Sequence, residues 1–135
     1  TMTSQENSRM HRIAELISAL GPYGEPVIEA LLLEYFRAQK KHPDWPQDAV
    51  HASAILSEEA GELTQAALDF HYGALEGKGL KWREMLDPMR LEAVQSGAMS
   101  VRFLLHLPEY QPKSGMTVYD TPDCGPVPAF NLSNQ

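Results

Sequence analysis

The chain has 135 residues, of which 43% are apolar, and 18 acidic against 11 basic residues give a formal net charge of −7. This length suits one domain with a single hydrophobic core, and the apolar fraction excludes wholesale disorder. An acidic balance disfavours a nucleic-acid partner, although a bound cation can reverse the local field for a small phosphate ligand. The single cysteine, Cys124, excludes an intrachain disulfide. No apolar run reaches the ~18 residues of a membrane span, so we expect a cytoplasmic protein with no membrane partner.

Helical periodicity dominates the first third of the chain, where strand signals are weak. A first helix is predicted over 7–20, because the glycine-proline pair at 21–22 stops it. A second helix is predicted over 26–41 and begins with a proline, which suits the first helical turn. The sequence His-Pro-Asp-Trp-Pro over 42–46 then predicts a turn.

Two more helices are predicted in the second half. The third runs over 48–72, and its buried stripe recurs every three or four residues: Leu56, Ala60, Leu63, Ala67 and Phe70. A glycine-containing loop follows, and the fourth helix starts at Asp87-Pro88 and ends at Pro108. The core stripe predicted for this helix consists of Leu91, Val94, Ala98, Val101 and Leu105.

These elements predict an all-α domain over residues 1–107, a bundle of four or five helices. Five of the ten prolines lie from Pro108 onward, where no helical pattern survives. Residues 108–135 are therefore predicted to be an extended proline-rich tail that packs on the domain or on a neighbouring subunit. Helices this amphipathic in so short a chain leave apolar surface exposed, so we expect a homo-oligomer.

Three glutamates stand together in the middle of the third predicted helix. Glu59 and Glu62 are three residues apart, so their carboxylates project side by side, with Glu58 close by. Such carboxylates repel one another unless they share a cation, and Mg²⁺ prefers carboxylate oxygens together with water and phosphate. The alternative is a solvated acidic face, as in most glutamate clusters on helices. Two details raise the metal interpretation: the cluster borders the apolar stripe, and Ala60-Gly61 leaves room for a close neighbour.

The fourth predicted helix carries a matching pair. Glu92 and Gln95 are again three residues apart, on a face that continues toward Arg102. If the third and fourth helices pack antiparallel, these two side chains converge with Glu59 and Glu62. The pairing predicts one acidic site between the two helices.

The pattern Glu58-Glu59-x-x-Glu62 followed by Glu92-x-x-Gln95 resembles the all-α nucleoside triphosphate pyrophosphohydrolases. That group includes MazG, the dimeric dUTPases and the phosphoribosyl-ATP pyrophosphatases, and its signature is a Glu-Glu-x-x-Glu helix followed by a Glu-x-x-Asp helix. Segment 54–63 looks like the metal helix of the family, and segment 90–99 looks like its second helix. The resemblance covers about residues 27–107.

The resemblance implies a MazG-like bundle that assembles as a homodimer or homotetramer. It also implies hydrolysis of a nucleoside triphosphate between the α- and β-phosphates, which yields a nucleoside monophosphate and pyrophosphate. The implied cofactor is Mg²⁺, with Mn²⁺ as a substitute, and the implied catalytic residues are Glu58 and Glu59. The attacking water would be activated either by the metal or by Glu58 as general base. The implied metal ligands are Glu59, Glu62, Glu92 and Gln95.

Basic and aromatic residues are expected to complete a substrate site. Arg102 follows the helix period from Glu92, and three more cations lie in the loop between the motif helices: Lys78, Lys81 and Arg83. Trp45 is a candidate for stacking on a base, and His51 lies on the same side of its helix as Glu59. For each residue an ordinary role stays open, namely a solubilising charge, a core aromatic or a structural histidine.

Gln95 departs from the family pattern, which has an aspartate there. A glutamine offers a carbonyl oxygen or an amide but no charge, so metal affinity should fall. The second hypothesis is therefore a catalytically weak or silent homologue that acts as a nucleotide-binding or regulatory module. A di-iron site is excluded, because no glutamate is followed three residues later by histidine. Nucleophile-elbow, P-loop and Cys-x-x-Cys motifs are also absent from the sequence.

Overall fold

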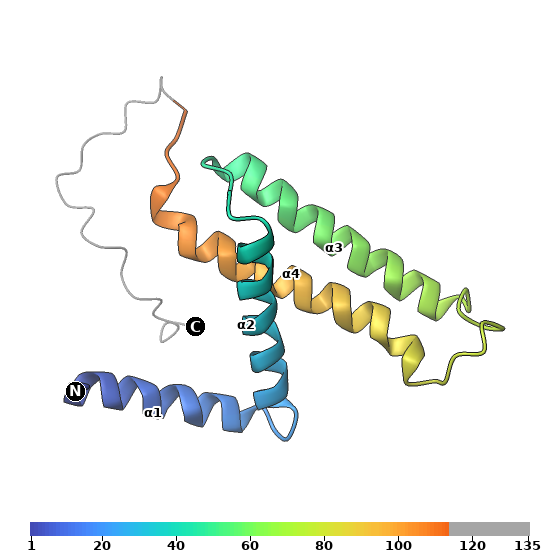
Figure 1. The fold of residues 1–135 in the computed structure, drawn as a ribbon, viewed down its shortest axis with the longest axis horizontal. Helices are drawn as coiled ribbons and strands as arrows, with labels where there is room; N and C mark the ends of the chain where they lie inside the picture. The colour runs from blue at the N-terminus through green and yellow to red at the C-terminus, as the bar shows by residue number, and fades with distance from the viewer. Residues whose placement is uncertain (114–135) are drawn as a thin grey trace.

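The computed structural model describes residues 1–113, and all regular structure within them is helical. This confirms the predicted all-α bundle (Figure 1). The tail from residue 114 onward, with Cys124, lies outside the described residues. Within the described part, no single helix is long and apolar enough to cross a membrane. The helices Ser4–Ala19 and Gly24–Lys41 reach that length and composition only when they are taken together, and the chain bends by 115° between them. The elements are α1 (Ser4–Ala19), α2 (Gly24–Lys41), α3 (Ala49–His71), the 3₁₀ turn η1 (Glu84–Leu86), α4 (Asp87–His106) and the 3₁₀ turn η2 (Leu107–Glu109).

The centre of the molecule is the antiparallel pair α3 and α4, which lie side by side, with α2 crossing α4 (Figure 1). The loop between α3 and α4 turns with positive φ at three glycines, a conformation that costs glycine little. Gly97 lets α2 approach α4 closely, because a Cβ at this position would overlap the side chain of Leu31. Small residues at the crossing therefore set how near α2 comes to the pair.

The buried core of the described residues is small and consists of Ala38, Ala52, Ala66, Ala98 and Met99. The stripe predicted for α4 is partly wrong, because Leu91 and Leu105 are 53% and 60% exposed whereas Met99 and Arg102 are buried. The reason is that α4 is covered by α2 and α3 together, so its buried face is the one between these two neighbours. On α3 the predicted stripe is half-buried, except for Ala60, which is exposed.

The first helix begins at Ser4, earlier than predicted, because Thr3 and Glu6 form a capping box. It leaves the bundle at a sharp angle to α2 (Figure 1). At the corner a Cβ on Gly24 would lie 2.6 Å from the carbonyl oxygen of Ile17, so only glycine allows this approach. Four apolar side chains along α1 and its C-cap remain 50–61% exposed, namely Met10, Ile13, Leu16 and Leu20.

Candidate metal centre

Three carboxylates meet between the middle of α3 and the N-terminal third of α4. Glu59 and Glu62 come from α3 and Glu92 from α4, and one oxygen of each lies within 4.8 Å of the others. The first two are neighbours because they are three residues apart on one helix. The third joins them because α4 runs antiparallel beside α3. The convergence predicted from the sequence is therefore confirmed for these three residues.

Two of the carboxylates are half-buried and incompletely satisfied. The Oε2 atoms of Glu59 and Glu92 are buried, and neither has a hydrogen-bond partner within the described residues. Buried polar atoms of this kind are rare in folded proteins and costly to leave unpaired. The third carboxylate, on Glu62, is exposed. The cluster therefore leaves oxygen donors that are available to a ligand.

The electrostatics of the cluster favour protonation or a cation. Burial raises the pKa of Glu59, and the negative charges of Glu62, Glu92, Glu58 and Glu34 raise it further. Burial also raises the pKa of Glu92, followed by the carboxylate of Glu62. Both pKa shifts arise because the negative charge of these carboxylates is disfavoured by burial and by neighbouring carboxylates. A divalent cation among these oxygens would offset that unfavourable charge.

A cavity of about 480 Å³ opens beside Glu59, between α2, α3 and α4. We call it the α2 cavity, and its volume suits a small molecule. Four residues singled out in the sequence also line it, namely Trp45, Glu58, Gln95 and Arg102. The remaining lining residues are Glu34, Arg37, Ala38, Lys41, His42, Asp44, Ile55 and Met99. A second cavity, of about 390 Å³, borders Glu62 and Glu92 on their other side.

Arg102 and Trp45 reach the α2 cavity but are held by internal contacts. Arg102 is 3% exposed, and its Nη2 donates to the carbonyl oxygens of His42 (2.6 Å) and Pro43 (3.3 Å). Its guanidinium lies 4.7 Å from the ring centroid of Trp45. The indole Nε1 of Trp45 in turn donates to the hydroxyl of Tyr110 at 2.7 Å. These contacts fix the turn over 42–46 to the end of α4, so both side chains support the wall of the cavity.

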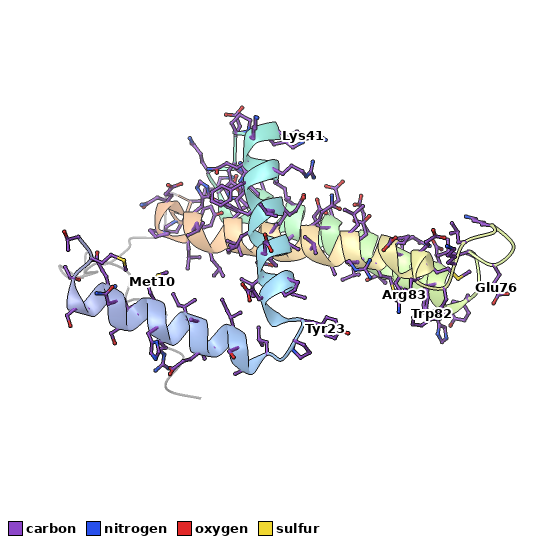
Figure 2. The ribbon with its side chains drawn as sticks, turned by 60° about the horizontal axis from the view of Figure 1, so that its bottom comes forward. Met10, Tyr23, Lys41, Glu76, Trp82 and Arg83 are labelled. Atoms are coloured by element: carbon purple, nitrogen blue, oxygen red, sulfur yellow. The ribbon has the colours of Figure 1, made fainter. Side chains whose placement is uncertain are left out.

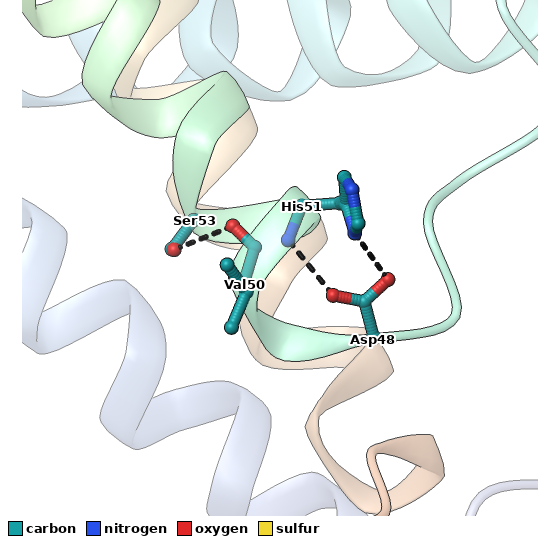
Figure 3. A network of polar contacts seen from close by, with 4 residues as sticks. All are labelled: Asp48, Val50, His51 and Ser53. Carbon is teal, nitrogen blue, oxygen red and sulfur yellow. Dashed lines mark hydrogen bonds and ion pairs between the residues drawn. The ribbon is translucent and has the colours of Figure 1, made fainter. Parts of the chain in front are cut away.

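The structure places His51 at the start of α3, outside the lining of the α2 cavity. The carboxylate of Asp48 caps this helix by accepting from the backbone N–H of His51 at 2.9 Å (Figure 3). The imidazole Nδ1 of His51 pairs with the same carboxylate at 2.6 Å. The first of these bonds is the main reason why the pKa of Asp48 is lowered. The role seen for His51 in the structure is therefore local and structural.

The three cations predicted for phosphate binding belong to the loop that joins α3 to α4, and Figure 2 shows Arg83 at that end of the helix pair. In the described chain, neither of the two cavities beside the glutamates is lined by these cations, which are Lys78, Lys81 and Arg83. Instead, α2 brings Arg37 and Lys41 to the α2 cavity, together with Glu34. Sequence reasoning missed these residues, although the spacing Glu34-x-x-Arg37 is itself typical of a helical ion pair.

Comparisons of the chain with models of known protein families, with curated proteins and with solved structures gave no match. Interpretation of the centre therefore rests on its geometry and on the motif resemblance carried by the two helices. The geometry consists of three convergent carboxylates, two unpaired buried oxygens and an adjoining cavity that contains both acids and cations.

Proposed function

We propose that this chain is a Mg²⁺-dependent nucleotide pyrophosphohydrolase of the MazG-like type, a hydrolase of acid anhydrides. Its reaction would convert a nucleoside triphosphate to a monophosphate and pyrophosphate. The observation that carries the proposal is the meeting of Glu59, Glu62 and Glu92, of which Glu59 also lines the α2 cavity. The motif resemblance supports it, because the same three positions match the metal-binding glutamates of that family.

The donor set fits a hard divalent cation. Three carboxylates within 4.8 Å of one another offer only oxygen, and two of their oxygens are buried without a partner. Glu59, Glu62 and Glu92 would hold the ion, and Gln95, on the wall of the adjoining cavity, would add a neutral carbonyl oxygen. When bound, Mg²⁺ would supply positive charge that binds the phosphates and offsets charge in the transition state.

Glu58 is the residue that we propose as general base. It lines the α2 cavity together with Glu59 but is not a member of the three-carboxylate cluster. A carboxylate that is not used as a ligand can accept the proton of an attacking water. Its exposed position gives that proton a route to solvent.

The experiment that tests the proposal is pyrophosphate release from a panel of nucleoside triphosphates with Mg²⁺ or Mn²⁺. We expect release by the wild-type chain and a loss of at least about 100-fold in Glu59→Gln. Glu76→Gln, an exposed change of the same chemistry in the α3–α4 loop, serves as the control. Absence of release from every nucleotide, with no effect of Mg²⁺ on the melting temperature, would overturn the proposal. Nucleotide binding without release would instead favour the second hypothesis, a silent nucleotide-binding module.

We also infer that the chain assembles as a homodimer or homotetramer. Among the described residues no large side chain is fully buried. The exposed apolar faces of α1 and α2 meet at the corner of these helices, where Ile17, Leu32, Leu33 and Phe36 border a shared hollow. Exposed apolar surface of this kind is typical of a subunit contact. Light scattering coupled to gel filtration tests the inference, and a monomeric mass at micromolar concentration would contradict it.

A further inference from the structure

We infer that Arg37 and Lys41 of α2 form the phosphate-binding side of the site and contact the polyphosphate chain of the substrate. Both residues line the α2 cavity, which also contains Glu59 and Gln95 on its α3 and α4 walls. The inference rests on the proposed function, because it assigns α2 as the element that binds the phosphates of the proposed nucleotide substrate.

A polyphosphate needs cations in this cavity. Its wall also carries Glu34, Asp44, Glu58 and Glu59, so the local field without a cation repels phosphate. The lining includes Arg37, Lys41 and Arg102 as permanent cations. The last of these already donates to the carbonyl oxygens of the 42–46 turn. Arg37 and Lys41 are therefore the two lining cations that are not tied to the backbone of the turn.

Glu34 holds Arg37 in position. The Nε of Arg37 donates to one carboxylate oxygen of Glu34 at 2.7 Å, and Nη2 donates to the other at 2.6 Å. The carboxylate side chain is 11% exposed, whereas that of Arg37 is 54% exposed. A guanidinium has five N–H donors, so this fork leaves the remaining donors for a second anion. The planar group suits a phosphate, which it can bind through two parallel hydrogen bonds.

Lys41 lies one helical turn after Arg37, so the two side chains project from the same side of α2. Its ammonium is a flexible point charge that can follow a phosphate, whereas the guanidinium of Arg37 is already oriented. One oriented cation and one flexible cation along a helix match an extended anion better than a single phosphate. The ligand class is therefore a polyphosphate chain, free or attached to a nucleoside.

The alternative is that Arg37 only forms an exposed ion pair with Glu34. To separate the two, inorganic tripolyphosphate is titrated calorimetrically in Mg²⁺ against wild-type, Arg37→Gln and Lys41→Gln chains. Lys40→Gln is the matched control, because Lys40 is on the same helix but does not line the cavity. We expect tripolyphosphate affinity to fall about tenfold in Arg37→Gln and severalfold in Lys41→Gln, with little change in the control.

Two further titrations show whether the loss of affinity concerns the phosphates or the metal. Mn²⁺ alone should bind all four chains equally, and a nucleoside without phosphates should show no dependence on either cation. Arg37→Lys keeps the charge but loses the fork, so its tripolyphosphate affinity should lie between wild type and Arg37→Gln. If Arg37→Gln proves poorly folded by circular dichroism, Lys41→Gln carries the comparison.

Equal tripolyphosphate affinity in Lys41→Gln, Arg37→Gln and the Lys40→Gln control would overturn the inference, as would no binding by the wild type. The proposed function would survive that result if the wild-type chain still released pyrophosphate from nucleotides. Conversely, a chain that releases none but binds tripolyphosphate through Arg37 would retain the phosphate subsite and lose the proposed activity.

Discussion

Glu59 on α3 and Glu92 on α4 bring carboxylate oxygens within 4.8 Å of each other, and each has an oxygen buried without a hydrogen-bond partner. Such a pair destabilises the metal-free fold, because burial and mutual repulsion both oppose ionisation. A cation that binds only the folded state reverses this effect. A divalent cation bound there as proposed would therefore stabilise the fold, so that melting temperatures can report metal binding.

Glu59→Gln should stabilise the metal-free chain at pH 7 by up to about 1 kcal/mol, because it removes the negative charge of a half-buried carboxylate, partly screened by solvent, while keeping the shape of the side chain. The same change should abolish the rise in melting temperature that Mg²⁺ gives to the wild type. Thermal melting with a chelator and with Mg²⁺ measures both effects. Glu76→Gln should change neither value, and a destabilised Glu59→Gln chain that still responds to Mg²⁺ would contradict the prediction.

The part of the stability of the metal-free chain that depends on Glu59 and Glu92 should fall as pH rises above about 4.5. The folded-state pKa values of Glu59 and Glu92 lie above the ordinary value of 4.5. The stability that these two carboxyls contribute to the fold is therefore fully present below about pH 4.5, and it is lost as pH rises through their raised folded-state pKa values. Melting temperatures measured with a chelator across this range should decline more for the wild type than for a Glu59→Gln, Glu92→Gln double variant. Parallel curves for the two chains would show that these carboxyls do not titrate with shifted pKa values.

Gln95→Asp should tighten Mg²⁺ and Mn²⁺ binding by about tenfold, because it adds a carboxylate to the wall that Glu59 also lines. It should also lower the stability of the metal-free chain, since a further negative charge enters the cluster. Calorimetric titration with Mn²⁺ measures the first effect, and melting with a chelator measures the second. Faster pyrophosphate release by this variant would show that the missing charge limits the natural site, whereas unchanged metal affinity would place Gln95 outside the metal centre.

Arg102→Lys should destabilise the fold by about 2 kcal/mol, because the ammonium cannot reproduce both the hydrogen bonds to the turn and the planar contact with Trp45. Urea unfolding measures the loss, and the exposed change Arg90→Lys provides a comparison. A direct phosphate role for Arg102 predicts the reverse pattern, in which stability is unchanged and tripolyphosphate affinity falls. The two roles are therefore separated by one pair of measurements.

The sequence predicted the α3–α4 part of the site well because local rules govern it. Asp48 caps α3, Asp87-Pro88 begins α4, and residues three apart on each helix share a face. The early start of α1 was also readable, since Thr3 and Glu6 have the spacing of a capping box. Each of these features depends on neighbours along the chain.

The contribution of α2 could not be predicted in the same way. Nothing in the spacing of Arg37 and Lys41 indicates which helix crosses α4, or at which point along it. The crossing depends on the space left by Gly97 and on the side chain of Leu31, which lies far away in the sequence. For the same reason the burial of Arg102 was missed, because its partners are backbone carbonyls of a distant turn.

The stacking of Trp45 gives the molecule an optical reporter. The chain has two tryptophans, and Trp82 is 67% exposed in the α3–α4 loop whereas Trp45 is half-buried on the wall of the α2 cavity. A Trp82→Phe chain would therefore emit from a single indole, which contacts the guanidinium of Arg102 and stacks near the imidazole of His106. Occupancy of the cavity would change the water around that ring, so its fluorescence would follow ligand entry in real time without any added dye.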